Sequence, residues 1–349
     1  MTDTHHPLLH AFAPPAKAEA DFVNIVRGEG SLLWDDAGNE YVDGLASLWY
    51  CQVGHGRAEI VDAVADQMRR LEAYNLFDPF TNEPAARAAA MIVERSPHPD
   101  GRVFLGCSGS EAVDTVLKMV RQFHQLAGDA ERQVVVRRTH GYHGTNFGGT
   151  SAQGIAPNRD GWGDLVPHFE EVPNDDLEAA ATLFADRGDR IAAVISEPVQ
   201  GAGGVHLPPD GYLEGLRRLC DDHGALLIFD EVISGFGRTG QWFGAQHFGV
   251  TPDLITFAKG ATSGYLPLSG VIASRRVCEA FEEPGFVFRT GYTYSGHPAS
   301  CAAGIANLEL MKAEGLVERA NHVGGRIRAG LEALQTDGLI KSWRGAGAV

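Results

Sequence analysis

The sequence has 349 residues, of which 44% are hydrophobic and 21% are charged, and its formal net charge is −16. This length allows two domains or one large α/β domain, and the hydrophobic content is ample for a buried core. So acidic a chain is a poor match for nucleic acids and anionic membranes, which disfavours both as partners on electrostatic grounds.

The sequence shows no membrane span and no secretory leader. No apolar run approaches the roughly 18–20 residues that a spanning helix needs, and residues 1–7 lack a basic region followed by an apolar one. The five cysteines are widely scattered and form no Cys-x-x-Cys pattern, which favours thiols of a reducing compartment over a disulfide framework or a zinc site. We therefore expect a cytoplasmic protein.

The first 20 residues are polar and contain two adjacent prolines and three histidines, His5, His6 and His10. We expect a mobile arm here and regard metal binding by these histidines as the weaker alternative. Residues 31–34 and 40–43 favour strands and flank a glycine-containing turn, which predicts a β-hairpin. Residues 58–71 carry apolar side chains at helical spacing and predict an amphipathic helix.

A run of small residues, Gly106 to Ser110, connects a predicted strand at 102–105 to a predicted helix that starts near Glu111. Small residues at such a junction leave backbone N–H groups free at the positive end of the helix dipole, which suits a phosphate group. Considered alone, Ser110 is better explained as the N-cap of the helix than as a phosphate ligand. The run matches neither the P-loop nor the dinucleotide-binding pattern.

Tyr142 lies between glycines just after a predicted strand at 133–137. An aromatic ring held in this way can lie flat against a planar ligand. His140 and His143 have a spacing that suits a metal, but no third ligand is evident, so we discount a metal site.

Three short apolar runs each lead into a charged residue. They are residues 191–195 before Glu197, 226–229 before Asp230 and 254–257 before Lys259, and a further strand is expected at 269–273. Unbroken apolar runs are typical of parallel strands covered on both faces, and ligands bind beyond the carboxyl ends of such strands. We expect Asp230 and Lys259 to share one crevice, with a plain ion pair as the alternative.

The block from 226 to 264 resembles the signature of the class III aminotransferases, fold type I enzymes that use pyridoxal phosphate. It contains both charged residues, Gly-Phe-Gly-Arg-Thr-Gly at 235–240 and a glycine-rich segment after Lys259. The resemblance extends from about residue 28 to 344. It implies an α/β fold with a mainly parallel sheet, helices on both faces and a smaller α+β domain. The expected division is an N-terminal arm with part of the small domain (1–58), a large cofactor-binding domain (59–311) and the beginning of the C-terminal small domain (312–349).

The same resemblance implies a role for each site residue. Lys259 carries pyridoxal 5'-phosphate as a Schiff base, and Asp230 pairs with the pyridine nitrogen. The remaining roles are phosphate binding by Ser108, Gly109 and Ser110, ring contacts by Tyr142 and Val232, organisation of the site by Glu197, a phosphate contact across a dimer by Thr293, and substrate contacts by Trp49 and Tyr142. No metal is expected.

The resemblance also indicates substrates and assembly. Relatives that use 2-oxoglutarate often have a glutamate where this chain has Ala202, which favours the branch that transfers amino groups from amines or ω-amino acids to pyruvate. We expect a homodimer with shared active sites, and pairing into tetramers stays open. Family members continue past residue 349, and the further part supplies an arginine for the substrate carboxylate.

Three other functions compete with transamination. The same cofactor site serves aminomutases, racemases and decarboxylases, and only the substrate pocket separates them. A catalytically silent homologue is the alternative from a different class. A nicotinamide-dependent dehydrogenase is disfavoured because no strand leads into a glycine fingerprint followed by an acidic residue.

Overall fold

A computed structural model describes residues 7–349 of the chain, so the expectations for His5 and His6 concern residues outside this range. Its main element is a seven-stranded sheet in the order β4-β10-β9-β8-β7-β5-β6. All neighbours from β6 to β9 pair in parallel, whereas β10 runs antiparallel to both β9 and β4. The strands are β4 (Arg102–Gly106), β5 (Val134–Arg138), β6 (Phe169–Val172), β7 (Ile191–Ser196), β8 (Leu226–Asp230), β9 (Leu254–Phe257) and β10 (Ser269–Ala273).

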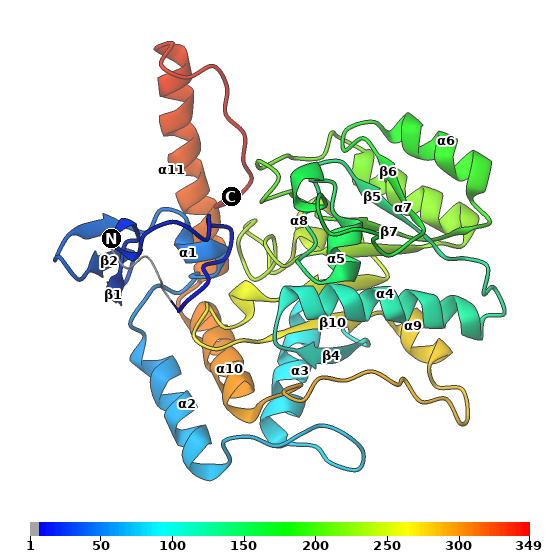
Figure 1. The fold of residues 1–349 in the computed structure, drawn as a ribbon, viewed down its shortest axis with the longest axis horizontal. Helices are drawn as coiled ribbons and strands as arrows, with labels where there is room; N and C mark the ends of the chain where they lie inside the picture. The colour runs from blue at the N-terminus through cyan, green and yellow to red at the C-terminus, as the bar shows by residue number, and fades with distance from the viewer. Residues whose placement is uncertain (1–6) are drawn as a thin grey trace.

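Both faces of this sheet are covered by helices, as the continuous apolar strands predict. Alternate side chains of β8 enter different clusters: Leu226 and Ile228 pack with α4, while Leu227 and Phe229 pack in the core on the opposite face. Figure 1 shows α4 lying across one face of the sheet. The first cluster includes residues of α4 (Gly109–Leu126), α5 (Phe147–Ala152) and α9 (Arg275–Ala280), and the second those of α3 (Glu83–Arg95), α6 (Leu177–Arg187), α7 (Tyr212–His223) and α8 (Gly244–Phe248).

A second, smaller region contains the N-terminal strands and the last helices. The predicted hairpin is present as β2 (Leu32–Asp35) and β3 (Glu40–Val42), and β1 (Ile25–Glu29) completes an antiparallel sheet. Figure 1 places this sheet and α11 on the same side of the molecule, away from α6. The other helices are α1 (Ala46–Trp49), α2 (Ala58–Arg70), α10 (Pro298–Ala313), which packs on α2 and α3, and α11 (Leu316–Thr336). Ile60 of α2 and Cys301 and Leu308 of α10 belong to the same core as the large sheet. Single 3-10 turns occur at Glu19–Asp21, Ala156–Asn158 and Lys259–Ala261.

Two general expectations can be compared with the structure. Over residues 7–349, no helix is both long enough and apolar enough to cross a membrane. All five cysteines are free thiols, and Cys220, Cys278 and Cys301 are buried, in agreement with the absence of a disulfide framework.

A buried carboxylate sets the position of β9 against β8. Asp253, only 7% exposed, precedes β9 and accepts hydrogen bonds from Leu227 N in β8 and from Arg217 Nη1, both at 2.8 Å. Arg276 Nη1 donates to its other oxygen at 3.1 Å. Asp253 N also donates to Leu227 O at 2.8 Å. Asp253 thus bonds to both the N–H and the C=O of Leu227, the first through its side chain and the second through its backbone. Asp253 therefore helps to fix the register that decides which side chains meet at the strand ends.

We expect Asp253→Ala to lower the free energy of unfolding by about 2–4 kcal/mol, because it leaves a buried N–H and a largely buried arginine without their acceptor. The measurement is a urea titration followed by circular dichroism. The matched control is Asp221→Ala, which removes the exposed partner of the same Arg217 and should cost less than about 1 kcal/mol. Equal losses in the two variants would contradict the role of Asp253.

Candidate active site

Asp230 and Lys259 meet at the carboxyl ends of two neighbouring strands. Asp230 is the last residue of β8 and pairs in register with Thr256 of β9, three residues before Lys259. Both residues line one cavity of about 120 Å³. The prediction that the two strands are adjacent and end at one crevice is confirmed. The other sequence-predicted residues in the cavity wall are Gly109, Ser110, Tyr142, Glu197 and Val232.

Lys259 lies in a strained backbone position. Its φ of 41° falls in the left-handed region, and the chain turns there from β9 into the 3-10 turn that begins at Lys259. Burial lowers the pKa of its amine below the ordinary value, against the opposing effects of Asp230 and Glu197, and Arg238 lowers it further. A lowered pKa increases the fraction of neutral amine, the form that can attack a carbonyl or accept a proton.

His143 holds the Asp230 carboxylate. The two side chains are 1% and 4% exposed, and His143 Nδ1 lies 2.7 Å from Asp230 Oδ2. Val232 N donates to the other carboxylate oxygen at 3.2 Å. A buried carboxylate needs such partners, and each of its oxygens keeps a free lone pair for a further donor. The sequence suggests only a metal-binding role for His143, and its position next to Tyr142 is the one signal for the role seen here.

Glu197 organises the opposite side of the cavity. It is 3% exposed and accepts hydrogen bonds from Tyr142 N at 2.8 Å and from Gly201 N at 3.0 Å. Burial raises the pKa of this carboxyl group to about 7; His143 lowers it and Asp230 raises it further. The same side chain therefore fixes the loop that carries the Tyr142 ring and the turn that follows β7.

The N-cap of α4 is Ser108, not Ser110 as the sequence suggested. Ser108 Oγ accepts a hydrogen bond from Glu111 N at 3.1 Å, while the Glu111 carboxylate accepts from Ser108 N and Cys107 N, which completes a capping box. Ser110 Oγ instead accepts from Thr145 N at 2.9 Å. The local signal for this cap is the Ser-x-x-Glu pattern of Ser108 and Glu111, since Ser110 has Val113 at the equivalent position. Ser108 lies outside the cavity wall, whereas Gly109 and Ser110 lie in it.

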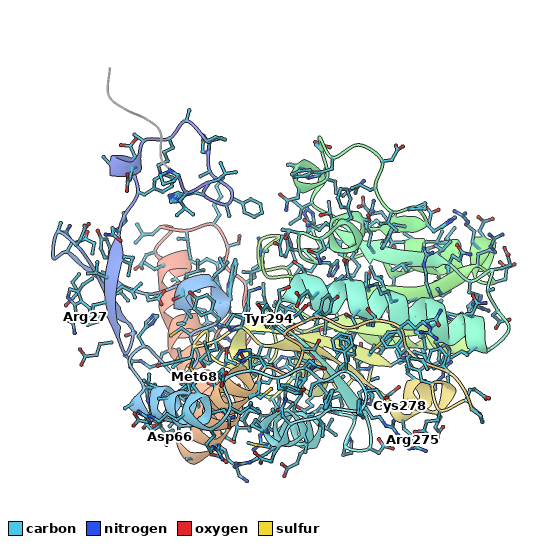
Figure 2. All side chains as sticks on the ribbon, turned by 60° about the horizontal axis from the view of Figure 1, so that its bottom comes forward. Arg27, Asp66, Met68, Arg275, Cys278 and Tyr294 are labelled. Carbon is cyan, nitrogen blue, oxygen red and sulfur yellow. The ribbon has the colours of Figure 1, made fainter. Side chains whose placement is uncertain are left out.

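Trp49 and Thr293 do not line the cavity. Trp49 is half-buried at the end of α1, with a φ of 59°. Thr293 is exposed in the loop before α10. The next residue, Tyr294, lies near the start of α4 (Figure 2), where its carbonyl accepts from Cys107 Sγ at 3.4 Å. The roles of both residues stay predictions.

The sequence of this chain matches a family model over nearly its whole length. The family is described as aminotransferase class-III, and the match covers residues 14–349. The chain belongs to the class-III aminotransferases. The predicted family, fold class and enzyme class are therefore confirmed, and this protein is a pyridoxal-phosphate-dependent aminotransferase.

Several known proteins are similar to this class-III aminotransferase. It is 38% identical over 346 residues to the putrescine–pyruvate aminotransferase of Pseudomonas aeruginosa, covering 93% of this chain and 75% of that one. An (S)-enantioselective ω-transaminase from Thermomicrobium roseum superposes with a TM-score of 0.93 at 38% identity, covering 98% of this chain and 80% of that one. An amine transaminase from an uncultivated Pseudomonas species, in its pyridoxal-phosphate-bound form, superposes with a TM-score of 0.91 at 34% identity, covering 99% of this chain and 83% of that one.

The cavity of the aminotransferase fits this cofactor. A half-buried amine, Lys259, and a buried carboxylate, Asp230, face it. At its edge, α4 begins with Gly109, where an added Cβ would lie only 3.3 Å from Val232 and 3.7 Å from Ala258, so a larger side chain would fill the space. His143 Nε2 is buried and has no hydrogen-bond partner within residues 7–349. The space beside Gly109 and the buried His143 nitrogen without a hydrogen-bond partner are compatible with a flat ring that bears a phosphate.

We expect the stability of this aminotransferase to fall between about pH 5 and pH 7.5 more steeply than that of a Glu197→Gln variant. Because the pKa of Glu197 in the folded chain is raised from 4.5 to about 7, the folded state holds this proton more tightly than the unfolded state. Its contribution is fully present below the unfolded pKa and is lost as the pH rises through the folded one.

Scanning calorimetry of the cofactor-free proteins at several pH values would measure this difference in melting temperature. Glu214→Gln, on the exposed side of α7, is the control and should follow the wild type. Parallel curves for wild type and Glu197→Gln would show that Glu197 does not titrate in this range.

Proposed function

We propose that this aminotransferase moves an amino group from an amine or ω-amino acid to a 2-oxo acid, with pyruvate as the acceptor and Lys259 as the residue that holds the cofactor covalently. One observation carries the proposal. Asp230, a buried carboxylate, ends β8, and Lys259, a half-buried amine, follows the neighbouring parallel strand β9; both line one cavity. Relatives that act on putrescine and pyruvate, and on β-alanine and pyruvate, support the choice of substrates.

Four residues of the cavity would hold the cofactor in place. Gly109 and Ser110 at the N-terminus of α4 would bind its phosphate through backbone N–H groups and a hydroxyl. Tyr142 and Val232 line the same cavity and would contact the two faces of the ring. The hydrogen bond from Tyr142 N to Glu197 keeps the loop of this aromatic residue in position.

When bound, pyridoxal phosphate supplies an electron sink for the electron pair left on the carbon that carries the amine after its proton is removed. Asp230, oriented by His143, would keep a proton on the pyridine nitrogen through its negative charge. Lys259 would take the proton from the amine-bearing carbon of the donor and deliver it to C4′ of the cofactor, because its lowered pKa leaves more of its amine neutral. General acid–base assistance of this kind contributes about 10²–10⁴-fold.

The acceptor is inferred from the turn after β7 together with the relatives. Gln200 is 1% exposed, accepts from Asn174 Nδ2 at 2.8 Å and donates to Thr139 O at 2.8 Å, so its side chain is a fixed part of the turn. Ala202 is exposed in the same turn and offers no charge there. A turn without a second carboxylate favours pyruvate over 2-oxoglutarate in this proposal.

We also propose that the enzyme is a homodimer with shared active sites. Thr293 is exposed in the loop before α10, which suits a residue that would reach the cofactor phosphate of a neighbouring subunit. Analytical ultracentrifugation tests the assembly, and a monomer at working concentration would contradict it.

Lys259→Ala should abolish turnover and remove the near-visible absorbance band that appears when pyridoxal phosphate is added to the wild type. The reason is that no other amine lines the cavity within the described residues. Lys341→Ala, which removes an exposed lysine near the end of the chain, should keep both the band and the activity. Undiminished turnover by the Lys259 variant would refute the assignment.

Asp230→Asn should still bind the cofactor but turn over at least about 100-fold more slowly, because a neutral amide cannot stabilise a proton on the pyridine nitrogen. Single-turnover kinetics with an amine donor measure this loss. A rate near that of the wild type would show that Asp230 does not have this role.

The rival pyridoxal-phosphate reactions are distinguished by product analysis. The enzyme is incubated with putrescine or β-alanine and pyruvate, and alanine is measured by chromatography. Formation of alanine supports transamination, whereas a rearranged, inverted or decarboxylated donor in its place supports an aminomutase, racemase or decarboxylase. A bound cofactor without any product supports the catalytically silent alternative.

A further inference from the structure

Three side chains of types that commonly bind metals meet between β3 and α2. Asp43, Cys51 and His55 each offer one ligand atom, and these three atoms lie within 4.8 Å of one another. The intervening chain is kinked at Ser47, whose φ is 59°, and Asp43 and His55 are in contact although they are 12 residues apart. Carboxylate oxygen, thiolate sulfur and imidazole nitrogen are the donor types that Zn²⁺ binds in proteins. The cluster therefore has the composition of a zinc site.

The ligand atoms are close to the spacing that a tetrahedral ion requires. Metal–ligand distances of about 2.0–2.3 Å place neighbouring ligand atoms roughly 3.3–3.7 Å apart. His55 Nε2 lies 2.8 Å from Asp43 Oδ2, and Ser47 Oγ lies 3.4 Å from the same nitrogen. A separation of the first two atoms by roughly half an ångström would therefore admit the ion. The Ser47 hydroxyl or a water molecule would complete the tetrahedron.

The simpler explanation for Asp43 and His55 is a structural hydrogen bond, and the surroundings of Cys51 argue for more. Asp43 and Cys51 line a second cavity of about 270 Å³, between this segment, the loop at 236–238 and α11. The side chains of Asp43 and His55 are 7% and 22% exposed. The ligands are thus shielded by protein, while the cavity gives a hydrated ion a route to them and leaves room for water in an open coordination position.

The charges of this cavity fit a divalent cation bound by a carboxylate and a thiolate. Such a complex has no net charge, so it adds no positive charge to a wall whose other charged side chains, Arg238 and Arg319, are cations. Arg238 is 8% exposed, and its Nε and Nη2 have no hydrogen-bond partner within residues 7–349. A thiolate at Cys51 would give this guanidinium group a nearby negative charge, which stabilises a buried cation.

Cys51 and Arg238 are close enough to influence each other. Burial raises the pKa of the Cys51 thiol to about 11, with a further contribution from Asp43 and an opposing one from Arg238. Burial lowers the pKa of Arg238, and Cys51 raises it. Without a metal the sulfur is therefore protonated at neutral pH. A bound Zn²⁺ would remove this proton, because a coordinating thiol is deprotonated outright.

We propose that Asp43, Cys51 and His55 bind one Zn²⁺ or a similar thiophilic divalent cation, with water or the Ser47 hydroxyl as the fourth ligand. The sulfur selects such ions over Mg²⁺ and Ca²⁺, which prefer oxygen ligands. The site is distinct from the candidate active site, because none of the three ligands lines the cavity of Lys259. The inference therefore does not depend on the proposed function, and its test needs no turnover.

The first test is equilibrium dialysis of the cofactor-loaded enzyme against Zn²⁺, followed by elemental analysis of the bound metal. The wild type should bind one equivalent that Cys51→Ala binds at least about 100-fold more weakly, because losing a ligand costs more than the roughly 10–100-fold typical of an outer-shell partner. The control, Cys107→Ala, removes the other half-buried thiol and should bind like the wild type. Equal affinity in the wild type and Cys51→Ala, as expected if histidines elsewhere hold the ion, would overturn the proposal.

The second test needs no variant. In the wild type, Zn²⁺ should slow the reaction of Cys51 with iodoacetamide at least about 10-fold, measured by mass spectrometry of the alkylated peptide, because the coordinated sulfur is no longer a free nucleophile. Mg²⁺ at the same concentration should have no effect. Cys107 in the same samples reports any general effect of the ion and should react at an unchanged rate. Equal rates for Cys51 with and without Zn²⁺ would contradict the site.

Discussion

The parallel pairing of β8 with β9 is the constraint on which the site depends. Asp230 ends the first of these strands and Lys259 follows the second, so the register of the pair decides whether the amine and the carboxylate reach one cavity. Asp253 contributes to that register from inside the sheet through its bonds to Leu227. The charged groups are thus positioned by backbone hydrogen bonds and buried apolar strands, and not by their attraction for each other.

Burial changes the protonation of each ionisable group in this region in a way that depends on the type of group and on its partners. Glu197 has hydrogen-bond donors but lies deep in the protein, and the pKa of its carboxyl group rises. The pKa of Lys259 falls for the same physical reason with the opposite sign, since burial disfavours the ammonium form. Arg238 cannot lose its proton, so it stays charged, and two of its nitrogens have no hydrogen-bond partner within residues 7–349. The same low solvent access therefore raises the pKa of a carboxyl group, lowers the pKa of an amine and leaves a guanidinium group charged.

A layer of supporting hydrogen bonds holds the residues that face the cavity. His143 and Val232 N fix the Asp230 carboxylate, Glu197 fixes the loop of Tyr142, and the capping box of Ser108 and Glu111 fixes the start of α4. Only Ser108 and Glu111 among these supporting groups lie outside the cavity wall. Groups so constrained lose little conformational freedom when a ligand binds, which is the condition for precise positioning.

The sequence by itself indicated most of the strands, because short and mainly apolar runs such as 226–229 and 254–257 favour the interior of a sheet. It did not indicate β1 or β6. It also placed Glu197, Asp230 and Lys259 at strand ends and indicated the family. The cap of α4 was expected at Ser110, although only Ser108 has a glutamate three residues later, the capping-box pattern. Only the tertiary structure decided that His143 bonds to Asp230, 87 residues away, and that two nitrogens of Arg238 are buried without a hydrogen-bond partner among residues 7–349. Apolar patterning acts between neighbours in sequence, whereas the pairing of a charge depends on which distant segments fold against it.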